Sequence, residues 1–214
     1  MDEIKIIGIT GSIGSGKSTV SEIMKQFGGN IINADEIAKE LMKRSKPAYH
    51  LVVEYFGKDI LAPDGEIDRK ALGNIVFNDK EKLNKLNALT HKAVGNEIKM
   101  KILELKEELS KLPLKKGDFK FVILEVPIPV EEGFFDTADT IWTTTANNDT
   151  RIERIIKRNG MTENEAESII SSQMTNSEYE AIADTVIINE GDEEQLKKIV
   201  AKELINYFNI EIEM

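Results

Sequence analysis

A run near the start of the chain, Gly11 to Ser18, constrains its fold more than any other feature. Glycines at the first and sixth positions, followed by lysine and serine, are the pattern of a phosphate-binding loop. The isoleucine-rich segment 4–9 precedes the run and predicts a buried strand. Apolar residues at helical spacing follow it, namely Val20, Ile23, Met24 and Phe27. A plain glycine-rich turn is the alternative, but strand, loop and helix in this order favour phosphate binding.

The residue types in this loop suit a nucleoside triphosphate. Gly11 and Gly16 let successive backbone N–H groups turn toward phosphate oxygens, and the helix that begins near Lys17 directs its positive end at them. Lys17 is expected to reach the β and γ phosphates, and Ser18 to supply an oxygen to Mg²⁺. The sequence therefore predicts ATP and Mg²⁺ as ligands.

Further runs of β-branched residues predict more strands, at 30–32, 119–126, 140–144 and 185–188. Near-continuous apolar strands are typical of a parallel sheet covered on both faces. Helical patterns separate them, which indicates an α/β fold with crossover connections.

Two connections are too long to be ordinary loops. From Asp35 to Asp118 there are about 80 residues, far more than a usual connection. One helical stripe in this stretch predicts an inserted helical subdomain: Ile98, Ile102, Leu105, Leu109 and Leu112. The second insertion, about 147–183, is predicted to hold two helices separated by Asn159-Gly160-Met161. Thr162 and Glu165 form a capping-box pattern for the second helix.

Composition excludes several classes of function. The 214 residues carry a formal net charge of -10, which argues against general binding to nucleic acid or anionic membranes. There is no cysteine, so disulfides and thiolate chemistry are excluded. No apolar run has the length of a membrane span, and the first residues lack a signal-peptide pattern. A cytoplasmic protein is expected.

Among nucleotide-binding proteins, the sequence favours a kinase. A GTPase needs an Asn-Lys-x-Asp guanine reader, and the nearest string, Asn84 to Asn87, ends in the wrong residue. A motor or assembly ATPase usually has a strand that ends in Asp or Asp-Glu, whereas here Glu125 is a lone carboxylate. Two alternatives stay open: another P-loop kinase acting on a nucleoside monophosphate or small metabolite, and a nucleotide-dependent switch or assembly ATPase.

Arginines in the second insertion support phosphoryl transfer. Arg151, Arg154 and Arg158 are spaced i, i+3 and i+7, so they project within a narrow arc of one helix face. Arginines that close over a transferred phosphoryl group offset its charge. The alternative is a solvated basic helix face.

Two carboxylates follow predicted strands. Asp35 comes after the second strand, at the rim where α/β sheets bind ligands, and is the candidate general base. It is equally suited to cap the following helix, 36–42. Glu125, at the end of the third strand, would organise Mg²⁺ through water or cap a backbone group.

Particular residues and strings are spread over nearly the whole chain: Gly8 to Val20, Asn33-Ala34-Asp35 with Ile37-Ala38, Asp64 to Leu72, Val76-Phe77, Leu86 to His91, Leu124 to Pro127, Arg154, Arg158, Gln173 and Ile188 to Asp192. In these motifs the chain resembles the dephospho-coenzyme A kinase family nearly from end to end. The resemblance implies transfer of phosphate from ATP to the ribose 3′-hydroxyl of dephospho-CoA, with no obligate protein partner.

The resemblance also assigns roles by position. Asp35 is implied as catalytic base, with Lys17 and Arg154 as further catalytic residues. The implied ATP cradle comprises Gly11, Gly14, Ser15, Gly16, Lys17, Ser18 and Thr19. Arg154 and Arg158 are implied to cover ATP from a lid, and Asn189 to lie near the adenine. Arg69, His91 and Glu125 are implied on the substrate side. From the residues alone, Arg69 is a surface residue at a helix start and His91 a structural histidine.

The family fold implies a five-stranded parallel core, a helical substrate domain and a small lid. The expected boundaries are 1–35, 118–146 and 184–214 for the nucleotide-binding core, 36–117 for the helical CoA-substrate domain and 147–183 for the lid. The sequence departs from the family pattern at Asn33, usually aspartate, and at Lys92, where proline usually follows the histidine. We expect Lys92 to loosen a helix start at His91.

Overall fold

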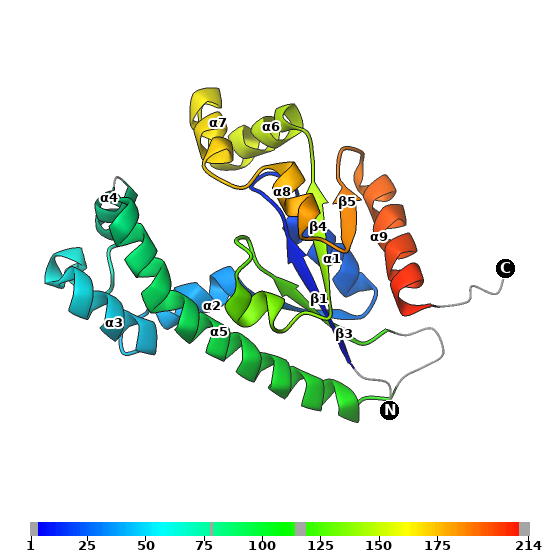
Figure 1. Cartoon of the computed structure of the whole chain (residues 1–214), viewed down its shortest axis with the longest axis horizontal. Helices are drawn as coiled ribbons and strands as arrows, with labels where there is room; N and C mark the ends of the chain where they lie inside the picture. The colour runs from blue at the N-terminus through cyan, green and yellow to red at the C-terminus, as the bar shows by residue number, and fades with distance from the viewer. Residues whose placement is uncertain (1–3, 78, 114–118, 210–214) are drawn as a thin grey trace.

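The computed structural model describes residues 4–77, 79–113 and 119–209. A sheet of parallel strands in the order β2-β3-β1-β4-β5 forms its centre (Figure 1). The strands are β1 (Lys5–Thr10), β2 (Gly29–Asn33), β3 (Phe121–Glu125), β4 (Thr140–Thr145) and β5 (Thr185–Ile188). The predicted α/β fold with a five-stranded parallel sheet is confirmed.

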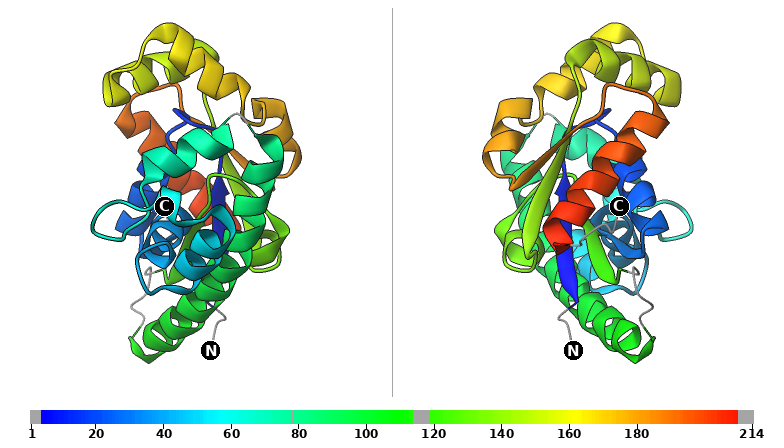
Figure 2. Two further views of the ribbon diagram at one scale, coloured as in Figure 1. Left: turned by 90° about the vertical axis from the view of Figure 1, so that its left-hand side faces the viewer. Right: turned by 90° about the vertical axis from the view of Figure 1, so that its right-hand side faces the viewer.

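The helices form three groups around this sheet (Figures 1 and 2). Beside the sheet lie α1 (Lys17–Gln26) and α9 (Glu193–Phe208). The first insertion contains α2 (Ala34–Leu41), α3 (Pro47–Phe56), the short 3-10 helix η1 (Lys58–Ile60), α4 (Arg69–Phe77) and α5 (Lys80–Lys111). A π-helical turn, η2 (Glu131–Phe135), follows β3. The second insertion contains α6 (Asn148–Asn159), α7 (Glu163–Ser171) and α8 (Asn176–Ala181).

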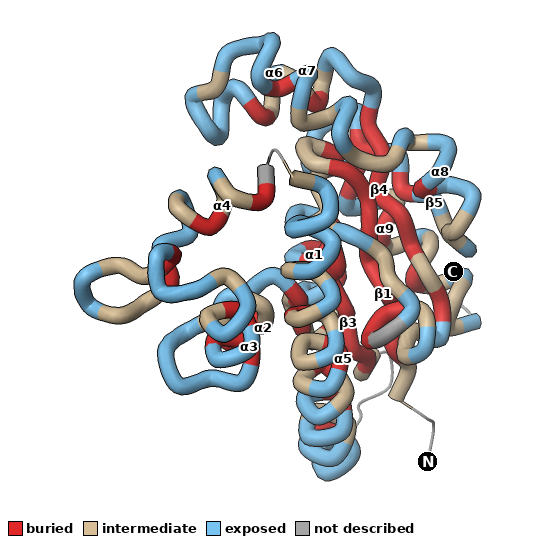
Figure 3. Tube along the Cα trace, turned by 60° about the vertical axis from the view of Figure 1, so that its left-hand side comes forward, coloured by how far each residue is buried: buried red, intermediate tan, exposed pale blue. Residues whose placement is uncertain are grey.

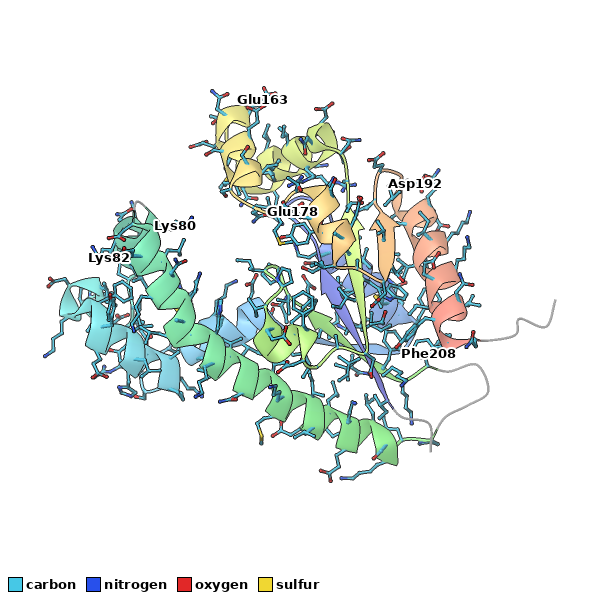
Figure 4. All side chains as sticks on the ribbon, viewed as in Figure 1. Lys80, Lys82, Glu163, Glu178, Asp192 and Phe208 are labelled. Atoms are coloured by element: carbon cyan, nitrogen blue, oxygen red, sulfur yellow. The ribbon has the colours of Figure 1, made fainter. Side chains whose placement is uncertain are left out.

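Alternation along β1 divides the core between the two faces of the sheet. Ile7 and Ile9 pack with α1 and α9, whereas Ile6 packs with α2 and α5. Burying an aliphatic side chain of this size contributes about 1.5–3 kcal/mol. Phe208, at the end of α9, completes the first face by lying 5.0 Å from Phe119 and 5.4 Å from Phe121 between ring centroids (Figure 4). A parallel sheet covered on both faces follows from this packing.

The long helix α5 carries the first insertion onto the sheet. Asp79 caps it by accepting from the N–H groups of Glu81 and Lys82. Ile98, Ile102 and Leu109 are buried on its sheet side, as predicted, and Leu105 is partly buried there. Leu112 was wrongly placed on this stripe, because it follows the helix, is 56% exposed and has an extended backbone. The proline after Leu112 disfavours the helical conformation there.

His91 and Lys92 lie in the middle of α5, not at a helix start, so the predicted loosening at His91 is wrong. Lysine has the backbone N–H that proline lacks, which allows the helix to continue through this position.

The outer part of the first insertion has its own small core. It lies between α3, η1 and α4 and consists of Tyr49, Val52, Ile60, Ile67, Leu72 and Val76. Figure 3 shows short buried stretches around α3 and α4, among segments of intermediate burial and exposed segments. This part of the insertion is therefore stabilised by its own small core and by packing against α5, whose Leu86 joins the cluster.

The second insertion has one more helix than predicted. The break at Asn159 to Met161 and the capping box of Thr162 with Glu165 are confirmed. A second capping box, formed by Thr175 and Glu178, starts the additional helix α8.

No helix in the described ranges combines the length and the apolar character needed to cross a membrane. The proposed division into core, substrate domain and lid stays a prediction, and its boundary between residues 117 and 118 lies outside the described residues.

Candidate active site

The candidate site lies where the neighbouring strands β1, β2 and β3 end. The phosphate loop follows β1, Asp35 follows β2, and Glu125 is the last residue of β3. In the sheet register Glu125 lies opposite both Asn33 of β2 and Ile9 of β1. Parallel strands all end at the same edge of a sheet, so these residues, far apart in sequence, lie together.

The phosphate loop has the backbone geometry that its glycines predicted. Gly14 and Gly16 have φ angles of 78° and 95°, in the region that favours glycine. A Cβ at Gly14 would lie 2.8 Å from the carbonyl oxygen of Arg151, and one at Gly16 would clash with the amide nitrogen of Asn189. Both positions are therefore closed to larger residues by conformation and by space.

Lys17 lies inside the loop, where its Nζ donates to the carbonyl oxygens of Gly11 at 2.5 Å and Ser12 at 3.3 Å. Burial lowers the pKa of Lys17 to about 8, although the carboxylates of Glu125 and Asp35 oppose this shift. The ammonium is thus held in a poorly solvated place where a phosphate oxygen would be a strong partner.

Ser18 and Glu125 form a pair of oxygen donors at the base of the loop. Ser18 Oγ donates to Glu125 Oε1 at 2.7 Å, and Glu125 is only 6% exposed. A hydroxyl and a carboxylate are ligands that Mg²⁺ accepts, and it usually completes its shell with phosphate oxygens and water. The described residues contain no group of three or more His, Cys, Asp or Glu side chains that would hold a metal alone. The donor set therefore fits a metal that arrives with a nucleotide.

Asp35 is exposed and lies in the first turn of α2. Asn33 is the N-cap of this helix, because its side chain accepts from the N–H of Glu36 at 3.1 Å. The alternative that Asp35 caps the helix is therefore wrong, and its carboxylate stays available. The positive end of the helix also favours a negative charge there.

Asp35 lines two cavities. The first, of about 410 Å³, is lined by the phosphate loop, Asp35, Glu125 and the α6 arginines Arg154 and Arg158. The second, of about 190 Å³, lies between Asp35, α5 and the segment after β3. Its walls are mainly apolar, with polar groups from Asn87, Thr90 and His91. One carboxylate between a polar loop cavity and an apolar cavity is an arrangement suited to transfer between two bound molecules.

Arg154 and Arg158 of α6 both line the loop cavity, but they differ in what they contact. Arg154 Nη1 lies 3.3 Å from the carbonyl oxygen of Gly14 and 3.4 Å from that of Ser15, and its Nη2 donates to Asn189. Arg158 is exposed and donates from Nε to the side chain of Asn159. The alternative of a solvated basic face is wrong for Arg151, which is 2% exposed and does not line the cavity.

The remaining predicted residues lie at different distances from the centre. Gly11, Ser18 and Thr19 line the loop cavity, whereas the Ser15 side chain is buried and does not. Asn189 is buried outside the loop and donates to the carbonyl oxygen of Ser15 at 2.8 Å.

Two predicted substrate-side residues lie apart. His91 lines the apolar cavity with Asp35. Arg69 lines a separate pocket with Met42 and Glu66, and its guanidinium lies 3.4 Å from the carbonyl oxygen of Lys39. The structure therefore does not bring Arg69 to the edge where Asp35 lies.

Sequence reasoning gave no role to several residues that shape the site. Gln173 accepts from the N–H of Ile13 at 2.8 Å and lines the loop cavity. Asn33 lines both the loop cavity and a neighbouring pocket. Gln173 is one of the residues that carry the family resemblance, but the 160 positions between it and Ile13 concealed the contact.

Comparisons with known proteins identify the family of the chain. The family model for dephospho-CoA kinase matches residues 5–195. A dephospho-CoA kinase from Carboxydothermus hydrogenoformans is 40% identical over 195 residues, which cover 91% of this chain and 90% of that protein. Among solved structures, a Thermus thermophilus protein designated TT1252 matches with a TM-score of 0.74 and 29% identity, covering 96% of this chain and 98% of that one.

The dephospho-CoA kinase from Campylobacter jejuni matches with a TM-score of 0.59 and 26% identity, over 95% of this chain and 97% of that one. A family match over most of the chain, together with relatives at this identity, excludes both alternatives: another P-loop kinase, and a nucleotide-dependent switch or assembly ATPase. The chain belongs to the dephospho-CoA kinase family, whose members use ATP to phosphorylate dephospho-CoA in the last step of coenzyme A biosynthesis.

Proposed function

We propose that transfer from ATP to the ribose 3′-hydroxyl of dephospho-CoA takes place at Asp35, which acts as general base. The observation that carries this proposal is that Asp35 lines both the loop cavity and the apolar cavity. An acceptor in the apolar cavity would present its hydroxyl to the carboxylate while ATP presents its terminal phosphorus from the other side. Asp35 then takes the hydroxyl proton as the new P–O bond forms and the bond to ADP breaks.

The donor side of the proposal rests on the loop. Backbone N–H groups from Gly14 to Thr19 surround the phosphates, and Lys17 exchanges its carbonyl partners for β and γ oxygens. Ser18, with Glu125 behind it, would hold Mg²⁺. When bound, Mg²⁺ neutralises charge on the phosphate oxygens during transfer.

The acceptor side rests on the apolar cavity. Its walls include Val94, Ile98 and Phe134, and a planar base is a suitable occupant of such a space. Asn87, Thr90 and His91 would then offer hydrogen bonds to the edge of the base. Arg69 lies farther along the first insertion, so we assign it to a more distant, anionic part of the substrate.

The two arginines of the lid, Arg154 and Arg158, have different roles. Arg158 lines the loop cavity, and its hydrogen bond to the side chain of the adjacent Asn159 does not tie it to the loop, so it can turn toward the transferred phosphoryl group. Arg154 is held by carbonyl groups of the loop and by Asn189, and reaches the nucleotide if those contacts are exchanged. Closure would also exclude water, which competes as an acceptor.

The proposed domains follow the same division of labour. Residues 1–35, 118–146 and 184–214 would bind ATP, residues 36–117 the CoA substrate, and residues 147–183 would form the lid. Asn189 as a neighbour of the adenine, and a cytoplasmic location, stay predictions.

The test is a stoichiometric assay with purified protein, ATP, Mg²⁺ and dephospho-CoA. We expect CoA and ADP to form in equal amounts, with the new phosphate on the 3′-oxygen by ³¹P NMR. ADP formed without CoA would instead indicate hydrolysis by a switch protein. A phosphate at another position of the ribose would contradict the placement of the acceptor hydroxyl at Asp35.

A further inference from the structure

The phosphate loop is contacted from its outer side by a buried arginine of the lid. Arg151, in the first turn of α6, donates from Nε to the carbonyl oxygen of Ile13 at 3.1 Å. Its Nη1 donates to the side chain of Asn148 at 3.1 Å, and its Nη2 is buried with no hydrogen-bond partner among the described residues. Only 2% of this side chain is exposed.

Burying a guanidinium in this way costs free energy unless interactions of the guanidinium compensate for it. Burial lowers the pKa of Arg151, which shows that its environment disfavours the charge. No carboxylate in the described part of the chain forms an ion pair with it to offset this. Among the described residues, the hydrogen bond to the Ile13 carbonyl is the one bond of the Arg151 guanidinium that reaches outside its own helix.

The bond to Ile13 fixes the orientation of a peptide group. The carbonyl of Ile13 and the N–H of Gly14 belong to one trans peptide, so they point in opposite directions. When Arg151 holds the carbonyl toward the lid, the N–H of Gly14 is turned away from Arg151; Gly14 lines the loop cavity, whereas Arg151 does not. The backbone of Arg151 also packs against Gly14, where a Cβ would lie 2.8 Å from the Arg151 carbonyl oxygen.

The same arrangement recurs along the loop. Asn189 donates to the carbonyl oxygen of Ser15 at 2.8 Å, which turns the N–H of Gly16 toward the other side. Gln173 holds the N–H of Ile13 itself. Two carbonyl groups of the loop, those of Ile13 and Ser15, are therefore held by polar side chains that do not line the loop cavity, Arg151 from the lid and Asn189 from the segment after β5.

We propose that Arg151 is a positioning residue that holds the phosphate loop in its nucleotide-binding curl, which makes the base of the lid a structural part of the donor site. Arg151 does not touch the nucleotide in this arrangement. It acts through the Ile13–Gly14 peptide, whose N–H it directs at the phosphates. The inference rests on the proposed role of the loop in ATP binding, but it does not depend on the identity of the acceptor.

The test is the affinity for ATP of Arg151→Met, measured by calorimetry without acceptor. Methionine keeps much of the apolar volume but removes the donor. We expect affinity for ATP to fall about tenfold, as for one lost charge-assisted hydrogen bond. The KM for the acceptor should stay within about twofold, since no acceptor contact changes. Arg151→Lys, which keeps one donor, should restore part of the affinity.

Two controls separate positioning from packing. Lys157→Met changes an exposed cation on the same helix and should leave ATP affinity unchanged. Asn148→Ala removes the side chain that holds Arg151 Nη1, so it should weaken ATP binding to a smaller extent and serves if Arg151→Met does not fold. Backbone amide exchange at Gly14 in the free protein should be faster in Arg151→Met and in Asn148→Ala than in wild type.

Normal ATP affinity in folded Arg151→Met, or an equal loss in Lys157→Met, would overturn the proposal. If Arg151→Met weakens ATP binding but the wild-type protein makes no CoA, this inference stands and the proposed acceptor is refuted instead.

Discussion

The hydroxyl of Ser18 donates to Oε1 of Glu125 at 2.7 Å, although 107 residues separate the two in sequence. Glu125 is nearly fully buried at the end of β3, and Ser18 is exposed at the start of α1. The carboxylate therefore orients the hydroxyl, and both residues line the loop cavity. Groups behind a metal ligand commonly set both its orientation and its basicity.

Replacing Glu125 by glutamine tests this relationship. Glutamine keeps an oxygen that can accept from Ser18 but removes the negative charge. We expect the Mg²⁺ concentration for half-maximal activity to rise about tenfold, the lower end of the effect of losing such a supporting group. Glu131→Gln, an exposed change in the segment after β3, is the matched control. Equal Mg²⁺ requirements in wild type and Glu125→Gln would contradict a role for Glu125 at the metal.

The role of Asp35 as general base predicts a selective loss of turnover. Asp35→Asn should lower kcat about 100- to 10,000-fold, the usual contribution of a positioned base. Affinity for ATP should change little, because the loop contacts are kept. Glu36→Gln makes the same charge change one residue away, on a side chain that does not line the loop cavity, and should retain activity. A normal kcat in Asp35→Asn would remove the base from the mechanism.

The sequence was sufficient to predict the sheet and the meeting of the loop with Asp35 and Glu125. Both follow from one physical fact, namely that parallel strands buried on two faces are nearly continuous apolar runs and all end at one edge. The helix α8 was missed although Thr175 and Glu178 form a capping pattern, because its six residues are too few to show helical periodicity.

The burial of Arg151 could not be predicted from the sequence in the same way. Its spacing from Arg154 placed both on one helix face, but burial depends on how closely α6 approaches the loop. That approach is permitted by Gly14, whose missing Cβ leaves space for the Arg151 backbone. A contact between two segments 138 residues apart depends on tertiary packing, which local patterns do not specify.

Asn33 caps α2 and lines the loop cavity, so its variants separate stability from catalysis. Asn33→Ala should lower the free energy of unfolding by about 1 kcal/mol, because the N–H of Glu36 loses its partner. Asn33→Asp keeps the cap and should stay within about 0.5 kcal/mol of wild type. Urea denaturation measures both. A destabilisation by aspartate as large as that by alanine would show that the side chain does not act as a cap.

The protonation state of Lys17 makes both the stability of the free protein and its ATP affinity depend on pH. Burial lowers its pKa to about 8, so in the free enzyme the ammonium is present below this pH and is lost as pH rises through it. In the unfolded chain lysine titrates near 10.4. Between these values the unfolded state binds more protons, so Lys17 makes the free protein more stable as pH rises, by about 1.4 kcal/mol per pH unit at most.

ATP binding should depend on pH in the opposite direction. The phosphates are fully ionised above their second pKa of about 6, so above pH 8 the titrating partner is Lys17, and affinity should fall toward tenfold per pH unit. Lys17→Met should bind ATP weakly at every pH and lose this slope, along with the rise in stability. Since the Glu125 carboxylate raises the Lys17 pKa, Glu125→Gln should move the start of the decline to lower pH. Calorimetric titrations from about pH 6.5 to about 9.5 cover this range. If the ATP affinity of wild type does not change with pH, or if that of Lys17→Met falls with the same slope, the lysine ammonium does not govern phosphate binding.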